Sequence, residues 1–168
     1  IGVTKEIKVT GDLALLLSLD FSKNMVNDIT KKKLKHINGD VIGINIRPWS
    51  QQSIKWGKDI IRLLVDTCKK PLDTRKPPLE KPFIVFLCSP LDVKLVKSLI
   101  KDTNLHYEII NCTKMKPSVY LDIIKSLKVL ISMRLHFLIF SVIAGTPCLG
   151  LPYSAKVKTF CKLFNIPT

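Results

Sequence analysis

Two short segments of the chain place an arginine directly after an apolar run. Asn45 lies near the end of the run 41–46 and Arg47 follows it directly. Arg134 and His136 follow a second run, which begins at Val129. Only four of the 27 basic side chains are arginines, so arginine at both places is selective. A planar guanidinium offers carboxylate or phosphate a rigid fork that an ammonium group cannot imitate. The two segments therefore indicate anion recognition, with pairing of each arginine to a nearby Asp or carbonyl as the open structural alternative.

Arg134 is expected in the first turn of a helix, where an anion is already favoured. The free backbone N–H groups and the positive end of the helix dipole attract negative charge at that position. An arginine there is placed against the dipole unless an anion lies beside it. We therefore expect an anion next to the backbone amides of Arg134, Leu135 and His136.

His136 begins a helix whose remaining side chains are almost all apolar. One interpretation is a core histidine whose hydrogen bonds are satisfied. The other is catalytic, because an imidazole at the hydrated end of a buried helix, close to an arginine and an anion, can exchange a proton near neutral pH. His36 and His106 have no comparable setting, so His136 is the candidate acid or base.

Apolar runs and helical stripes alternate along the chain and define the elements that must position these side chains. Strands are expected at 41–46, 83–88, 107–110, 129–131 and 148–151, and helices around 60–68, 95–100, 120–127, 135–144 and 157–164. The proline-rich stretch 71–82 predicts a surface loop. The alternation predicts an α/β fold, a Rossmann-like parallel sheet with helices on both faces. Ligands of such sheets gather at the carboxyl ends of the strands, where both arginines fall.

Length and composition fit one domain covering residues 1–168. The first residues contain neither an initiator Met nor a signal peptide, so we expect them to continue a longer chain. No stretch reaches the roughly 18 uninterrupted apolar residues of a membrane span. The five cysteines are odd in number and include no C-x-x-C pair. This pattern disfavours disulfides and zinc and indicates buried thiols in a reducing compartment.

The net charge of +14 is compatible with nucleic-acid binding, but the excess is almost entirely lysine, which we expect to form a solvated surface. The acidic residues are distributed unevenly, because residues 123–168 carry six cations and no carboxylate. We therefore expect this end of the chain to face an anion, and we expect no nucleic-acid partner. The sequence also lacks the dinucleotide, P-loop, zincin and hydrolase-elbow motifs.

The segment that carries Arg134 resembles a known family signature. Residues 129–140 (VLISMRLHFLIF), followed by 144–147 (AGTP) and Tyr153, are similar to the C-terminal signature of the polysaccharide pyruvyl transferases. Upstream, residues 9–14 and 43–47 resemble that family's opening segment and its G-x-N-x-R strand. The resemblance therefore spans nearly the whole chain.

The resemblance implies a two-domain GT-B enzyme of which this chain is the C-terminal half, so the isolated chain is expected to be inactive. Such an enzyme moves the pyruvyl group of phosphoenolpyruvate onto two sugar hydroxyls as a ketal. The resemblance implies that Arg47 and Arg134 bind the phosphate and carboxylate of this donor. Asn45 and Leu135 are then further substrate-binding residues, and His136 does the acid/base work. Phosphoenolpyruvate is a substrate in this scheme, and no metal or cofactor is required.

The implied partners are phosphoenolpyruvate, a cell-surface saccharide acceptor that is free or lipid-linked, and the missing N-terminal domain. The implied location is the cytoplasm, including peripheral attachment at the inner face of the membrane. Two alternatives remain open. A GT-B glycosyltransferase or sugar-nucleotide epimerase would have the same fold, although residues 123–168 offer no carboxylate for a nucleotide ribose. The second alternative is a non-catalytic basic module that binds anions.

Overall fold

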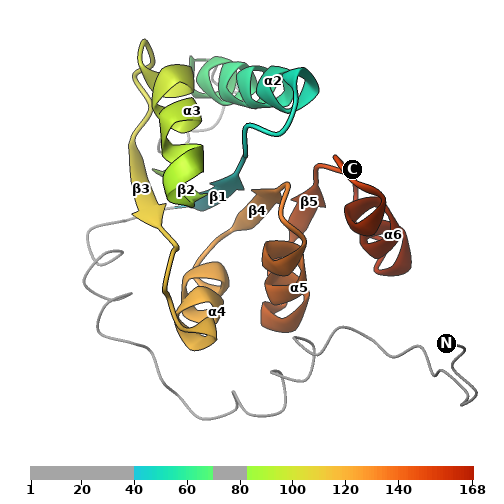
Figure 1. The fold of residues 1–168 in the computed structure, drawn as a ribbon. Coiled ribbons are helices and arrows are strands. Elements are labelled where there is room, and N and C mark those ends of the chain that lie inside the picture. Colours follow the sequence, from blue (N-terminus) through green and yellow to red (C-terminus); the bar gives the residue numbers. More distant parts are fainter. Residues whose placement is uncertain (1–39, 70–82) are drawn as a thin grey trace, which may run out of the picture.

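Residues 40–69 and 83–168 are described in the computed structural model of the chain (Figure 1). The proline-rich stretch 71–82, His36 and the family-like segment 9–14 lie outside the described residues, as does the side chain of Cys68. The expectations for those parts of the chain stay predictions.

The described part of the chain contains one sheet of five parallel strands. The strands are β1 (Val41–Asn45), β2 (Phe83–Cys88), β3 (Tyr107–Asn111), β4 (Val129–Ser132) and β5 (Cys148–Gly150). Their spatial order is β3-β2-β1-β4-β5. Almost every residue of β2 is apolar and buried, which is typical of a strand covered on both faces.

The helices between these strands cover both faces of the sheet. They are α2 (Gln51–Lys69), α3 (Pro90–Ile100), α4 (Pro117–Lys125), α5 (Leu135–Ala144) and α6 (Ala155–Leu163). α2 and α3 pack on one face, α4 and α5 pack on the other, and α6 lies beside α5 (Figure 1). Among these helices none is long and apolar enough to cross a bilayer. The structure confirms the Rossmann-like α/β fold predicted from the sequence.

The ends of the helices follow local signals. α5 closes at Gly145, whose φ of 69° lies in the left-handed region that glycine adopts without strain. α2 and α3 begin well before their apolar stripes, because polar side chains cap them. At the start of α2, Ser50 Oγ accepts a 3.2 Å hydrogen bond from the Ser53 amide, and at the start of α3 the Asp92 carboxylate accepts the Ser89 amide at 2.9 Å.

The order of the strands reverses at β1. From β1 the sheet grows outward through β2 and β3, and the chain then returns to place β4 and β5 on the other side of β1. β1 and β4 are aligned so that Asn45 pairs with Ser132 at their carboxyl ends. Ligands of doubly wound sheets bind in the crevice beyond the strand ends at such a reversal. Both arginine segments therefore lie where a ligand site is expected.

The cysteines of the described residues agree with the predicted buried thiols. Cys88, Cys112 and Cys161 are buried, and Cys148 is half-buried. Burial raises the pKa of the Cys148 and Cys161 thiols above the ordinary value. These two thiols therefore stay protonated at neutral pH.

Candidate functional site

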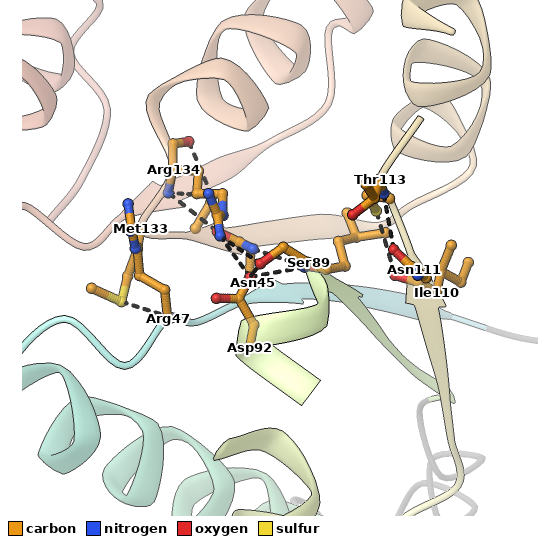
Figure 2. A network of polar contacts seen from close by, with 12 residues as sticks. Asn45, Arg47, Ser89, Asp92, Ile110, Asn111, Thr113, Met133 and Arg134 are labelled. Atoms are coloured by element: carbon orange, nitrogen blue, oxygen red, sulfur yellow. Dashed lines mark hydrogen bonds and ion pairs between the residues drawn. The ribbon is translucent and has the colours of Figure 1, made fainter. Parts of the chain in front are cut away.

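Asn45 ends β1 and joins three strands at the reversal point (Figure 2). Its Nδ2 donates a 2.6 Å hydrogen bond to the carbonyl of Leu87 in β2. Its Oδ1 accepts hydrogen bonds from the Arg134 amide at 3.2 Å and from the Ser132 hydroxyl at 3.4 Å. Asn45 is fully buried, so its polar atoms are used within the protein. In this structure Asn45 holds the backbone of Arg134 in place, and its contact with a substrate stays a prediction.

The Arg134 side chain points across β1 toward the start of α3 (Figure 2). Its Nη2 donates to the Ser89 hydroxyl at 3.0 Å and to Asp92 Oδ2 at 2.7 Å, and the Asp92 side chain is 1% exposed. The Arg134 side chain is 29% exposed. Among the described residues its Nε and Nη1 have no hydrogen-bond partner. Arg134 is paired with an aspartate on one side and available to an anion on the other.

Asp92 and Ser89 are the site residues that sequence reasoning missed. Asp92 Oδ2 also accepts hydrogen bonds from the Ser89 amide at 2.9 Å and from the Ser89 hydroxyl at 2.8 Å. An acidic residue at the third helical position that binds the N-cap amide forms a capping box. The sequence carries this signal as S-x-x-D before the apolar stripe of α3. Nothing local indicates that Arg134, 42 residues away, completes the cluster.

Cys88 ends β2 directly before this cluster and is buried. Burial, followed by the negative charge of Asp92, raises the pKa of the Cys88 thiol to about 12. The thiol is therefore protonated at neutral pH and is a poor nucleophile. Across residues 40–69 and 83–168, no three His, Cys, Asp or Glu side chains converge as metal ligands.

Arg47 follows β1 and is held by two aromatic side chains. Its guanidinium carbon lies 4.8 Å from the centre of the Trp49 ring and 5.7 Å from that of the Tyr153 ring. Its Nη1 donates a 3.4 Å hydrogen bond to the Tyr153 hydroxyl, and its amide donates to Met133 Sδ at 3.3 Å. Cation–π contacts orient an arginine without neutralising its charge. Tyr153 belongs to the family-like segment, but its contact with Arg47 was not predicted.

Arg47 and Arg134 both lie at the carboxyl edge of the sheet, as predicted. Their guanidinium groups are bound at different places, Arg134 at the start of α3 and Arg47 against Tyr153, which follows β5. The two groups share no partner within the described part of the chain. The structure therefore brings the two arginines to the same edge of the sheet but gives them separate partners.

The N-terminus of α5 offers fewer free amides than predicted. The Arg134 amide is occupied, because it donates to Ser132 Oγ at 3.1 Å as well as to Asn45 Oδ1 at 3.2 Å. The amides of Leu135 and His136 have no acceptor among the residues described. An anion at this helix can therefore use the amides of Leu135 and His136 but not that of Arg134.

His136 is the second residue of α5 and is exposed. The interpretation of His136 as a core residue is therefore wrong, since the buried side of α5 begins at Phe137. Leu135 is half-buried and lines an open apolar depression of about 440 Å³ between α5 and α6, together with Ile139 and Phe160. Leu135 can thus offer its amide to an anion while its side chain faces this depression.

A parallel sheet with two arginines and a helix N-terminus at its reversal point defines an α/β domain suited to an anionic ligand. The chain belongs to the polysaccharide pyruvyl transferase family, whose model, described as Polysaccharide pyruvyl transferase, matches residues 1–155. This match confirms the resemblance found in the sequence.

Among solved structures, the chain is similar to UDP-GlcNAc 2-epimerase from Neisseria meningitidis bound to UDP-GlcNAc. The TM-score is 0.61 at 13% sequence identity, so the likeness concerns the fold alone. The similarity covers 92% of this chain and 40% of the epimerase chain, so this chain spans less than half the length of that protein. No curated protein matches the chain.

Proposed function

We propose that the chain is the C-terminal half of a two-domain enzyme that transfers the pyruvyl group of phosphoenolpyruvate to a saccharide as a ketal. The observation that carries the proposal is Arg134 at the N-cap of α5, whose side chain is 29% exposed and whose Nε and Nη1 have no hydrogen-bond partner among the described residues. Membership of the family supplies the class of reaction. The likeness to a longer chain, of which this one covers 40%, supports a second domain.

Phosphoenolpyruvate carries two anionic groups, a phosphate and a carboxylate, on a small carbon frame. Arg134 and the amides of Leu135 and His136 would bind one of these groups. Arg47, held by Trp49 and Tyr153, would bind the other. Two arginines with separate partners suit a donor with two anionic groups better than a ligand with one.

The reaction requires a proton at one carbon of the donor and a sugar oxygen at its neighbour. The methylene carbon of phosphoenolpyruvate gains a proton and becomes a methyl group, while the first sugar hydroxyl attacks the carbon that carries the phosphate. Phosphate then leaves, and the second sugar hydroxyl attacks the same carbon and closes the ketal. The two hydroxyl protons balance the proton gained by the methyl group and the one taken by phosphate. His136, exposed beside the anion site, is assigned to carry a proton in these steps.

The leaving phosphate needs its negative charge neutralised as it departs. The Arg134 guanidinium and the N-terminus of α5 would do this, so the proposal assigns no metal and no cofactor. The acceptor is a cell-surface saccharide or its precursor, free or lipid-linked, bound largely by the other domain. The enzyme would act in the cytoplasm or peripherally at the inner face of the membrane.

The test is acceptor-dependent consumption of phosphoenolpyruvate by the intact two-domain enzyme. NMR should detect a ketal methyl signal on the saccharide together with released phosphate, and neither signal without an acceptor. Consumption of a UDP-sugar without any use of phosphoenolpyruvate would instead support the glycosyltransferase or epimerase alternative. Salt-sensitive binding to polyanions without any response to phosphoenolpyruvate would support the basic-module alternative.

A further inference from the structure

We propose that Asp92 is a positioning residue that fixes the Arg134 guanidinium for donor binding. The proposal rests on the proposed function for the identity of the donor. Asp92 lies at the start of α3, 42 residues before Arg134, and outside the segment 129–140 that carries the family-like signature. The role of Asp92 is therefore inferred from its contact with Arg134 in the folded chain and not from the signature sequence.

Asp92 is a buried carboxylate that is hydrogen-bonded through one of its two oxygens. One oxygen, Oδ2, accepts three hydrogen bonds, from the Ser89 amide, the Ser89 hydroxyl and Arg134 Nη2, at 2.9, 2.8 and 2.7 Å. Burying a charge is costly unless the charge is paired and hydrogen-bonded, and here both conditions are met. The N-terminal turn of α3 further favours a negative charge at this position. The Asp92 carboxylate therefore has a fixed position, and it can fix the position of the Arg134 guanidinium.

Arg134 needs such an anchor because its position is electrostatically unfavourable. It is the N-cap residue of α5, where the helix dipole repels a cation. A long arginine side chain without a partner would also sample many rotamers and swing away from the helix. The contact with Asp92 engages Nη2 and leaves Nε and Nη1 without a hydrogen-bond partner among the described residues. Asp92 thereby selects which nitrogens of Arg134 meet the donor.

The experiment measures the order of the Arg134 side chain and donor binding in the same samples of the intact enzyme. Asp92→Asn removes the charge but keeps an oxygen that can accept the Ser89 amide, so α3 stays capped. Nitrogen-detected NMR should give slowly rotating Arg134 guanidinium signals in the wild type and averaged signals in Asp92→Asn. Because a hydrogen bond to a charged group is involved, phosphoenolpyruvate affinity should fall about 10-fold or more in the variant.

Asp102→Asn is the matched control, because it removes one negative charge from an exposed residue just beyond the opposite end of α3. It should leave both the Arg134 signals and the affinity unchanged. If Asp92→Asn does not fold, Ser89→Ala removes one acceptor of Nη2, keeps the carboxylate, and should give partial averaging with a smaller loss of affinity.

The outcomes separate the inference from the proposed function. If phosphoenolpyruvate binds the wild type and Asp92→Asn equally well, or if Arg134 stays ordered in the variant, the positioning role is wrong while the donor assignment survives. If phosphoenolpyruvate leaves the Arg134 signals of the wild type unchanged, the donor assignment is wrong and the positioning role falls with it. Arg134→Lys replaces the planar guanidinium by an ammonium group. Its affinity for phosphoenolpyruvate is the reference value for an enzyme without the guanidinium.

Discussion

Arg47 and Arg134 stand at the ends of neighbouring strands, yet their guanidinium groups are bound on opposite sides of the β1–β4 pair. Arg134, which follows β4, reaches past β1 to the start of α3. Arg47, which follows β1, reaches past β4 to Tyr153 beyond β5. The two cations are therefore fixed independently, and each can be altered without releasing the other.

Arg134→Lys should weaken binding of phosphoenolpyruvate by the intact enzyme although the net charge does not change. A lysine ammonium carries its three N–H groups on one nitrogen, so it cannot contact Asp92 and also reach the donor from separate nitrogens as a guanidinium does. We expect the KM for phosphoenolpyruvate to rise about 10- to 100-fold, the equivalent of one hydrogen bond to a charged group. The measurement is steady-state kinetics with each substrate varied in turn. An unchanged KM for phosphoenolpyruvate would remove Arg134 from the donor site.

His136→Gln should separate binding from turnover in the intact enzyme. Glutamine keeps a similar volume and can form hydrogen bonds but cannot cycle a proton, so single-turnover rates should fall by about 10²- to 10⁴-fold while donor affinity largely persists. The melting temperature should hardly change, because His136 is exposed. Normal turnover in this variant would end the acid/base assignment.

Asn45→Ala should lower the stability of the fold itself. The substitution removes the side-chain donor of the Leu87 carbonyl and leaves the Arg134 amide with Ser132 Oγ alone. Leaving buried polar groups unsatisfied costs about 1–3 kcal/mol, which urea unfolding can measure. Asn104→Ala, at an exposed position, is the matched control and should be nearly neutral. Equal stability of the two variants would contradict the positioning role of Asn45.

The 168-residue chain alone should bind phosphoenolpyruvate weakly and transfer no pyruvyl group. In the proposed two-domain enzyme the other domain holds the acceptor against the donor. The isolated chain therefore lacks the rate enhancement that comes from holding the two reactants together. Isothermal titration and a ketal assay on the chain test both statements. Acceptor-dependent turnover by the chain alone would refute the two-domain proposal.

Cys88 should make stability depend on pH in the alkaline range. The thiol pKa is raised from 9.0 to about 12 in the folded chain, so above pH 9 the unfolded state loses a proton that the folded state retains. Stability should therefore fall as the pH rises from 9 toward 12. Comparison of unfolding free energies of the wild type and Cys88→Ala isolates this contribution from other titrating groups. A pH-independent difference between the two proteins would contradict the raised pKa.

Local patterns predicted the elements well wherever an apolar run had clear borders. β2 and α5 were predicted with the bounds that the structure has, because prolines and glycine flank their apolar residues. The starts of α2 and α3 were missed, since their first turns carry few apolar residues and are set by serine and aspartate caps.

The candidate site was predicted less completely than the fold. The positions of Arg47 and Arg134 at the sheet edge follow from strand order, which the alternating pattern implies. Their partners Tyr153 and Asp92 lie 106 and 42 residues away, so the contacts depend on packing that no local window contains. The same holds for Asn45, whose type suggested a ligand contact but whose burial is a property of the whole sheet.

The long reach of the Asn45 hydrogen bonds bears on how the chain folds. Its partners lie 42, 87 and 89 residues away, so each bond closes a long loop, and the bonds to Ser132 and Arg134 form only after β4 has joined β1. The architecture that orients Arg134 is thus expected to be absent from the folding nucleus. A ligand of this site would then slow unfolding without accelerating folding. It would prolong the lifetime of the native chain by lowering the unfolding rate alone.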